Sequence, residues 1–316
     1  MRTSTLLPVL ARNLVLAGAI IALGGSQNAY AEEAVALDTA AIEAATGLKG
    51  ALNKEEEVFK VSAPRTDVKI TVDGAVLPPF MGVTSWAAFK SDPKGGSMVM
   101  GDLVLFEDEV NPVMSVLLDH GVSVTAIHNH FFHASPAVYF MHIGGVGSAA
   151  ALAGGVRAAF DKTRDIRLAA PQPATHFTHA PLPSVNAVTP APLEGIFGGK
   201  GMAKDGMVKF VFGRSATMAC GCVVGKEMGI NTWAAFMGDD AQAVVDGDFA
   251  TVAGELQTVL KTLRAAGINI VAIHSHMEEE SPKYIFLHYW GAGSAATLAQ
   301  AVKAALEAQK ASSVKP

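Results

Sequence analysis

The sequence predicts an α+β protein built from two tandem homologous domains, each with the element order β-β-α-β-β-α and a ferredoxin-like-related sheet with helices packed on it. The main observation is an internal repeat. Residues 101–160 align with residues 247–306 without a gap, and 24 of these 60 positions are identical. Upstream, "MGVTSWAAF" (81–89) matches "MGINTWAAF" (228–236) after a shift of one residue. The second observation is that strand-like and helix-like segments alternate in the same order in both copies.

The first 31 residues have the features of a secretory signal peptide. Arg2 and Arg12 form a basic start, an apolar stretch follows, and Ala29-Tyr30-Ala31 has the form of a cleavage site. We therefore expect an exported protein, periplasmic or secreted after cleavage near Ala31. No later segment approaches the roughly 20 uninterrupted apolar residues of a membrane helix. We expect the mature chain to be soluble, with no membrane span.

Each copy is expected to contain the same elements. The segments "TSWAAF" and "NTWAAF" and the residues around Gly101-Asp102 and Gly247-Asp248 read as strands, and the helices of residues 108–121 and 254–267 end at glycines. Two β-branched strands form a hairpin across a Ser-Pro turn, and an alanine-rich helix closes the unit. The domain boundaries follow as 32–168 and 193–316, joined by a proline-rich linker at 169–192 that contains His176 and His179.

Two tryptophans and two aspartates also occur in both copies, and we expect them to have structural roles. Trp86 and Trp233 are expected to pack in the core or between the domains, with the lining of a ligand pocket as the alternative. Asp102 and Asp248 each follow a glycine and are expected to be turn residues, with support of neighbouring histidines as the alternative.

The candidate site consists of histidines, and six of the ten lie at matching places in the two hairpins: His128, His130, His142, His274, His276 and His288. Residues two apart on a strand face the same side, so the first two of each set are expected to project together. If strand partners sum to 270, His142 lies opposite His128. Three convergent imidazoles suit zinc, with copper or iron as alternatives. The competing interpretation is that the histidines are hydrogen-bonded ends of buried strands.

The two copies differ beside the histidines. Copy two has Glu278, Glu279 and Glu280 where copy one has Phe132, His133 and Ala134. Glu280 is the candidate fourth ligand or catalytic base. His133 either extends the first site or is exposed at the tip of the hairpin. The only cysteines, Cys220 and Cys222, are read as small residues in a turn or strand, with a soft-metal pair as the alternative.

The composition excludes several functions. The formal net charge is −5 and no Lys/Arg cluster is present, which argues against nucleic acid as a partner. A P-loop, a nucleophile elbow and a Rossmann fingerprint are absent. The expected partners are a metal ion and, for an enzyme, a small-molecule substrate. The oligomeric state, the identity of the metal and the number of sites are not determined by the sequence.

The motifs "DEVNPVMSVLLDHGVSVTAIHNH…SP…FMH", their second copy and "MGINTWAAF" resemble the LppY/LpqO-type exported proteins over roughly residues 55 to 308. The resemblance implies a duplicated domain without an assigned activity and draws attention to the same six histidines. Family copies carry an acidic residue just before Ser/Thr-Pro. Glu280 matches this pattern and Ala134 departs from it, which puts a complete first site in doubt. The chain also lacks the lipobox cysteine of the anchored lipoproteins.

Three functions follow. The first is an exported protein that binds a transition metal in order to store, buffer or deliver it. The second is a metal-dependent hydrolase with its active site in the second copy and Glu280 as the base. The third is a non-metal module for a ligand or partner, with structural histidines and an apolar groove lined by Trp86 and Trp233.

Overall fold

The computed structural model describes residues 37–313, so the predicted signal peptide lies outside the described residues. Repeat 1 comprises α1 (Thr39–Thr46), β1 (Gly50–Asn53), β2 (Val58–Pro64), β3 (Thr71–Val72), β4 (Ala75–Val76), η1 (Pro79–Met81), β5 (Thr84–Ser91), β6 (Ser97–Phe106), α2 (Glu107–Asp119), β7 (Ser123–His128), β8 (Ala134–Ser135), β9 (Val138–Gly147) and α3 (Ala149–Ala169). Repeat 2 comprises α4 (Pro190–Phe197), β10 (Met202–Lys204), β11 (Met207–Gly213), β12 (Ala216–Thr217), β13 (Val223–Val224), η2 (Lys226–Met228), β14 (Asn231–Gly238), β15 (Ala243–Thr251), α5 (Ala253–Ala265), β16 (Asn269–His274), β17 (Ile285–Gly293) and α6 (Ala295–Ser313).

The predicted β-β-α-β-β-α order is present in both repeats, as β5-β6-α2-β7-β9-α3 and β14-β15-α5-β16-β17-α6. Each repeat also starts with a helix and two strands that the sequence pattern did not predict. These are α1, β1 and β2 in repeat 1 and α4, β10 and β11 in repeat 2. The two helices have only eight residues each, and β1 and β10 are short and largely exposed, so their hydrophobic pattern is weak.

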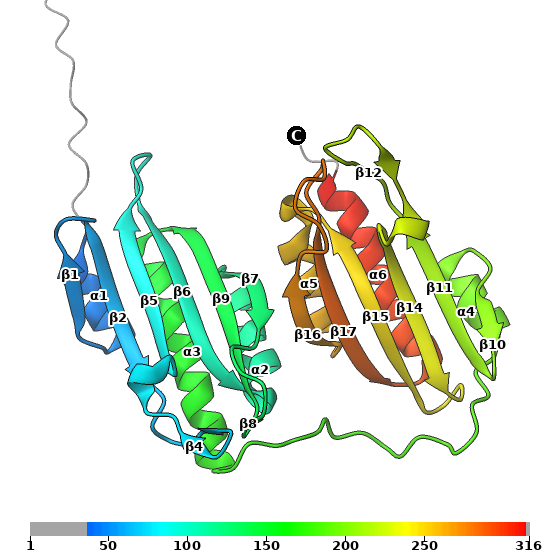
Figure 1. Cartoon of the computed structure of the whole chain (residues 1–316), viewed down its shortest axis with the longest axis horizontal. Coiled ribbons are helices and arrows are strands. Elements are labelled where there is room, and N and C mark those ends of the chain that lie inside the picture. The colour runs from blue at the N-terminus through cyan, green and yellow to red at the C-terminus, as the bar shows by residue number, and fades with distance from the viewer. Residues whose placement is uncertain (1–36, 314–316) are drawn as a thin grey trace, which may run out of the picture. The chain divides into compact units, whose positions relative to one another are not determined.

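The main strands form one sheet, in the order β1-β2-β5-β6-β9-β7-β16-β17-β15-β14-β11-β10, with all neighbours antiparallel. The helices of each repeat cover one face of its strands (Figure 1). The other face carries the residues discussed below and is called the open face. The chain is thus a mixed α/β protein with a large antiparallel sheet. The ferredoxin-like relationship stays a prediction.

The repeats meet where β7 pairs with β16, at Ile127 and Ile273. Two aligned side-chain amides add symmetric contacts. The Asn111 amide on α2 donates to the Ile270 carbonyl and accepts from the Ile270 amide. Gln257 on α5 makes the same two hydrogen bonds with Val124. Each helix therefore satisfies backbone groups of the central strand in the other repeat.

A buried carboxylate anchors the start of the long helix in each repeat. Glu109 accepts from the Phe106 amide, which is the capping position of α2, and is paired with Arg65 and Arg167. Glu255 accepts from the Val252 amide and is paired with Arg214. Both carboxylates lie in the first turn of their helices, and the arginine partners explain how they are held in the interior.

A small apolar cluster lies on the open face at one end of each repeat. In repeat 2 the β12–β13 hairpin contributes to it, and the cluster encloses Phe286 on β17 together with Ile230 and Tyr284. In repeat 1 the corresponding cluster encloses Phe140 on β9. These clusters fix the hairpin loops that carry the candidate site. No helix among residues 37–313 has the length and apolar character needed to cross a membrane.

Candidate metal centre

A row of three side chains crosses neighbouring strands on the open face of each repeat. In repeat 2, Trp233 on β14 lies opposite Asp248 on β15, and Asp248 lies opposite His288 on β17. Trp86, Asp102 and His142 form the same row in repeat 1. Directly opposed residues on antiparallel strands project from the same face, so the sheet register brings tryptophan, aspartate and histidine together twice.

The other two histidines of each group come from the hairpin loop, and here two predictions are wrong. Strands β7 and β16 end at His128 and His274, so His130 and His276 lie in loops and not on strands. The register also differs from the predicted sum of 270, because His142 pairs with Ala126. The same register holds from the His128–Phe140 pair next to the hairpin loop to the Ala126–His142 pair, so the hairpin loop sets it. An irregularity between Val124 and Ala126 changes the pairing only beyond this point, and β16 has the matching irregularity between Ile270 and Ala272.

A flat aromatic contact holds the loop histidine over the sheet. The His276 ring stacks on Phe286 with ring centroids 3.5 Å apart and planes inclined by 4°. His130 stacks on Phe140 in the same way, at 3.4 Å and 6°. The buried phenylalanine therefore returns the loop histidine to the side of its strand neighbours, which a strand position alone would not achieve.

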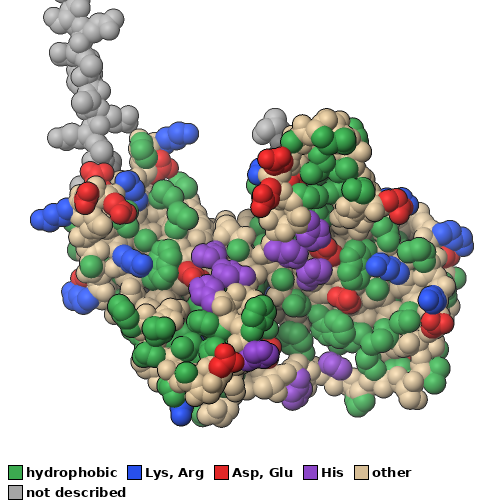
Figure 2. All heavy atoms as spheres, viewed as in Figure 1, with side chains coloured by type: hydrophobic (Ala, Val, Ile, Leu, Met, Phe, Trp, Pro, Cys, Tyr) green, Lys and Arg blue, Asp and Glu red, His purple; other side chains and the backbone are tan. Residues whose placement is uncertain are grey.

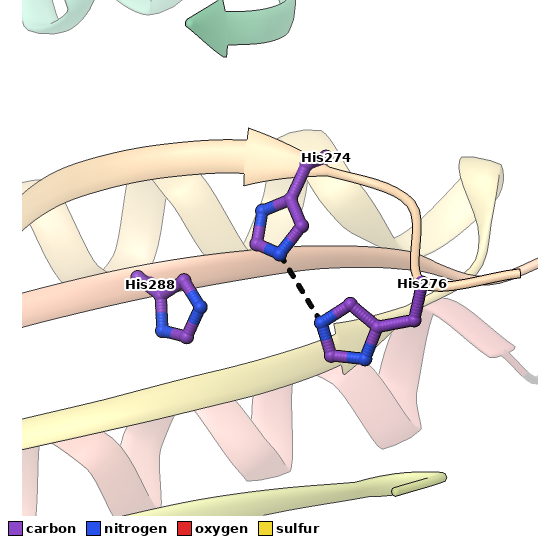
Figure 3. A group of neighbouring side chains, drawn as sticks. All are labelled: His274, His276 and His288. Atoms are coloured by element: carbon purple, nitrogen blue, oxygen red, sulfur yellow. Dashed lines mark hydrogen bonds between the residues drawn. The ribbon is translucent and has the colours of Figure 1, made fainter.

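The three imidazoles of repeat 2 converge (Figure 3). The Nε2 atoms of His274 and His276 are 3.1 Å apart, and the rings of His274 and His288 stack at 5.1 Å. One ligand atom from each of the three residues lies within 4.8 Å of the other two, and within residues 37–313 no other group of three His, Cys, Asp or Glu residues meets this condition. Both histidine groups are visible on the open face (Figure 2).

The repeat-1 group has similar ring contacts. The Nε2 atoms of His128 and His130 are also 3.1 Å apart, and the His128 and His142 rings stack at 5.0 Å. The three ligand atoms of this group do not come within the 4.8 Å that repeat 2 achieves. Repeat 2 therefore has the more compact set of ligand atoms.

Asp248 is a further candidate for the site, where the sequence pattern favours a turn residue. It lies in the middle of β15, with 4 % of its surface exposed, and not in a turn. One carboxylate oxygen is 3.6 Å from the Nε2 atom of His276, and the other is buried without a hydrogen-bond partner. Asp102 lies in the middle of β6 and also has a buried oxygen without a partner. A charged residue retained in both copies within an apolar strand was the sequence signal for this role.

Burial dominates the electrostatics of the site. It raises the pKa of Asp248 to about 6, against the opposing effect of His288. Burial also lowers the pKa of His274 and His276 below 6.5, and the charge of His288 acts in the same direction. The pKa values of His128 and His130 are lowered mainly by burial as well. These imidazoles are thus neutral at pH 7, which is the form that binds a metal.

Glu280 is buried within the hairpin loop, with 4 % of its surface exposed. One of its oxygens accepts a hydrogen bond of 3.0 Å from the Tyr284 amide, and the other has no partner in the described chain. It is not a member of the compact histidine group. Its hydrogen bond gives Glu280 a role in closing the loop, while its role as ligand or base stays a prediction.

Trp86 and Trp233 are half-buried, so the expectation that they pack in the core is wrong. The ammonium groups of Lys60 and Lys209 lie over their rings, at 4.2 Å and 3.9 Å from the centroids. Trp233 lines a cavity together with Asp248 and His276. The alternative interpretation, a pocket-lining tryptophan, therefore describes repeat 2 better.

The remaining candidates are not members of the compact histidine group. Cys220 and Cys222 are exposed free cysteines in the loop between β12 and β13. His133 is exposed and has a left-handed backbone conformation, with φ of 58°. His176 and His179 are exposed in the segment between α3 and α4, as expected for a linker.

The chain belongs to the family described as Domain of Unknown Function (DUF1259), whose model matches residues 40–162 and 191–308. The two matches agree with the two repeats. No curated protein matches the chain.

Two microcompartment shell proteins are similar among solved structures. The trimeric bacterial microcompartment shell protein PduB has 12% sequence identity and a TM-score of 0.20, covering 82% of this chain and 89% of its own. The fused permuted hexameric shell protein MSM0275 from the RMM microcompartment has 15% identity and a TM-score of 0.18, covering 69% of this chain and 87% of its own. Such low TM-scores support no conclusion about fold or function.

Proposed function

We propose that repeat 2 binds a divalent transition metal, most simply zinc, through His274, His276 and His288. The observation that carries the proposal is the set of three ligand atoms within 4.8 Å of one another. Two nitrogens that each lie about 2.0–2.1 Å from a tetrahedral zinc are roughly 3.3–3.4 Å apart. The Nε2 atoms of His274 and His276 are 3.1 Å apart, so a small displacement accommodates the ion. Imidazole also suits copper and iron.

Asp248 is the carboxylate that we propose as the fourth donor, and it lies beside the compact set of three ligand atoms rather than within it. Its unpartnered buried oxygen lies on a carboxylate beside His276. A buried carboxylate without a partner is unfavourable, and a cation among the three imidazoles would supply the missing interaction. A set of three imidazoles and one carboxylate is a common zinc environment.

The biological role that fits this site and the predicted signal peptide is that of an exported, periplasmic or secreted metal-binding protein of the LppY/LpqO type. In this role the protein stores, buffers or delivers its metal ion. The absence of an array of closely spaced methionines in the sequence favours a single well-formed site over a multi-ion carrier.

A metal-dependent hydrolase is the second candidate, and one observation favours it. A cavity of about 520 Å³ reaches Asp248 and His276, so the site has room for a substrate next to the ligands. A bound zinc would act as a Lewis acid and make water a better nucleophile. Asp248, whose carboxylate lies 3.6 Å from the Nε2 atom of His276, or Glu280 would serve as the base.

The test is metal analysis of the purified mature protein beside the His274→Ala/His276→Ala variant. We expect about one tightly held metal ion per chain in the wild type, and we expect the variant to lose this ion. If the wild type carries no metal above background and the variant takes up metal equally, both metal-based functions are wrong, and the module with structural histidines remains.

The two metal-based functions are separated by turnover. Zinc-loaded protein is assayed with chromogenic phosphate and carboxylate esters, and Glu280→Gln and Asp248→Asn are compared with the wild type. Turnover that one of these variants abolishes while the metal is retained identifies a hydrolase and its base. Metal binding without turnover of any ester supports storage or delivery.

A further inference from the structure

The cavity beside the repeat-2 histidines has a distinctive lining. One side is formed by His276 and Asp248, and an adjoining wall is formed by Trp233. The rest of the polar lining consists of three lysines, Lys200, Lys209 and Lys226, together with Glu227 and Asn231. The volume of about 520 Å³ lies in the range of cavities that hold small molecules.

The charge of this cavity is opposite to that of the protein. Its three lysines face two acidic residues of the lining, Asp248 and Glu227, which gives a formal charge of 3 − 2 = +1. The whole chain carries −5. A divalent cation at the proposed site adds two further positive charges. A positive recess on an acidic protein attracts anions and concentrates them locally.

Lys209 is the lysine best placed to meet a ligand. It projects from β11, is half-buried and holds its ammonium 3.9 Å from the centroid of the Trp233 ring. Lys200 and Lys226 pair with carboxylates, at 2.8 Å from Glu194 and 3.2 Å from Glu227. Lys209 makes no salt bridge within residues 37–313. Its charge acts on Asp246, whose pKa it lowers against the effect of burial, and its ammonium still lies in the lining of the cavity, where a ligand can reach it.

Repeat 1 shows which part of this arrangement is shared. Lys60 lies over Trp86 as Lys209 lies over Trp233, and the lysine–tryptophan contact is therefore a common feature of the sheet. The short helix η2 starts with Lys226, whereas the equivalent helix η1 starts with Pro79. The additional lysine is thus specific to the repeat with the compact histidine group.

We infer that this cavity is the ligand pocket of the repeat-2 site and takes a small organic anion, a molecule with a phosphate or carboxylate group joined to an apolar ring or chain. The anionic group pairs with Lys209 and Lys226, and the apolar part contacts Trp233. The inference rests on the proposed metal-binding function, because the metal would add the charge that holds an oxygen of the ligand beside His276. It gives the storage protein an anionic co-ligand, or the hydrolase its class of substrate.

Calorimetric titration of the zinc-loaded mature protein with phenylphosphonate tests the inference. This probe combines an anionic group with an aromatic ring and has no ester bond to hydrolyse. Binding is expected in the wild type and is expected to weaken at least about tenfold in Lys209→Gln/Lys226→Gln, because each lysine contributes a charge-assisted hydrogen bond. Benzyl alcohol, which has the ring but no charge, is expected not to bind measurably.

Lys60→Gln is the matched control, since it removes the equivalent lysine of repeat 1 and is expected to leave phenylphosphonate affinity unchanged. Lys226→Gln alone changes a side chain that is 60% exposed, so it provides the same test if the double variant folds poorly. Equal affinity in wild type and lysine variants, or an equal loss in Lys60→Gln, would overturn the inference.

Zinc content is measured on the same samples, so the two proposals fail separately. Zinc-loaded wild type that does not bind phenylphosphonate contradicts the anion pocket and leaves the metal site standing. Wild type that does not take up zinc contradicts the proposed function and, with it, the inference.

Discussion

The two histidine groups share the parts that the sheet provides and differ in the parts that loops provide. In both repeats the same tryptophan, aspartate and histidine lie in one cross-strand row, and the loop histidine stacks on a buried phenylalanine. The loops differ: Glu280 replaces Ala134, and Lys226 replaces Pro79. Strand register and a stacking contact therefore position the rings alike in both repeats, and the composition of the neighbouring loops distinguishes the two groups.

The largest expected effect concerns the histidine pairs. His274→Ala/His276→Ala should lower the zinc affinity of the tightest site by more than about a thousandfold, because two of its ligands are lost. His128→Ala/His130→Ala should leave this affinity unchanged. Competition with a chromophoric chelator measures both values. Equal losses in the two variants would show that the groups are equivalent and that the difference between the repeats has no bearing on metal binding.

The buried carboxylates at the helix starts provide a comparison of stability. Glu109→Gln should cost about 3–5 kcal/mol of unfolding free energy, because it leaves two largely buried arginines without their shared carboxylate. Glu255→Gln should cost less, because the side chain of its partner Arg214 is 25% exposed. Urea unfolding gives both values, and an equal cost would contradict this account of the two pairs.

Substitutions of the two aspartates in the cross-strand rows should differ in their effect on zinc affinity. Asp248→Asn keeps the shape of the side chain and removes its charge, and should weaken zinc binding by roughly 10–100-fold, as for residues that support or complete a metal site. Asp102→Asn should not change the tightest site. Chelator competition is again the measurement. A larger effect of Asp102→Asn would assign the main site to repeat 1.

Acid should release the metal over a defined range. Lowering the pH from 7.5 to 5.5 should reduce zinc affinity by about tenfold or more, because protons compete for the ligands. The loss should begin near pH 6, where Asp248 takes up a proton, whereas His274 and His276 resist protonation because burial lowers their pKa. In Asp248→Asn the step near pH 6 should be reduced. An unchanged profile in that variant would show that Asp248 is not coupled to the metal.

The smallest effect is expected for the cysteines. Cys220→Ser/Cys222→Ser should change zinc affinity and unfolding free energy by no more than about twofold and 0.5 kcal/mol, since both residues are exposed. Elemental analysis and urea unfolding test this under reducing conditions. A lost metal ion would assign the β12–β13 loop to a metal site.

Much of the fold could be predicted because the repeat doubles each local signal. Strands such as β5 and β14 and helices such as α2 and α5 carry long patterns that occur twice. The initial helix and two strands of each repeat could not be predicted, since they are short and exposed. The cavity could not be predicted either, because residues of these initial segments line it: Lys209 lies on β11 and Lys200 follows α4.

The sequence predicts which histidines form the site, but it predicts their arrangement in space less well. Repetition identifies the six histidines, but strand alternation does not reveal the register of the hairpins, which places His142 opposite Ala126 and His288 opposite Ala272. The stacking of His276 on Phe286 is likewise a tertiary contact without a local pattern. The glycine before Asp248 favours a turn, whereas the repetition of this aspartate inside a strand is the stronger signal.

The pairing of β7 with β16 affects whether a single repeat would stay monomeric. A strand at the edge of a sheet presents unpaired backbone groups and invites association with other chains. A single repeat would have such an edge at β7 or β16, and in the duplicated chain each strand covers the other. The edges that remain are β1 and β10, of only four and three residues. Duplication thus protects the protein from aggregation, and a chain cut between the repeats would be expected to self-associate.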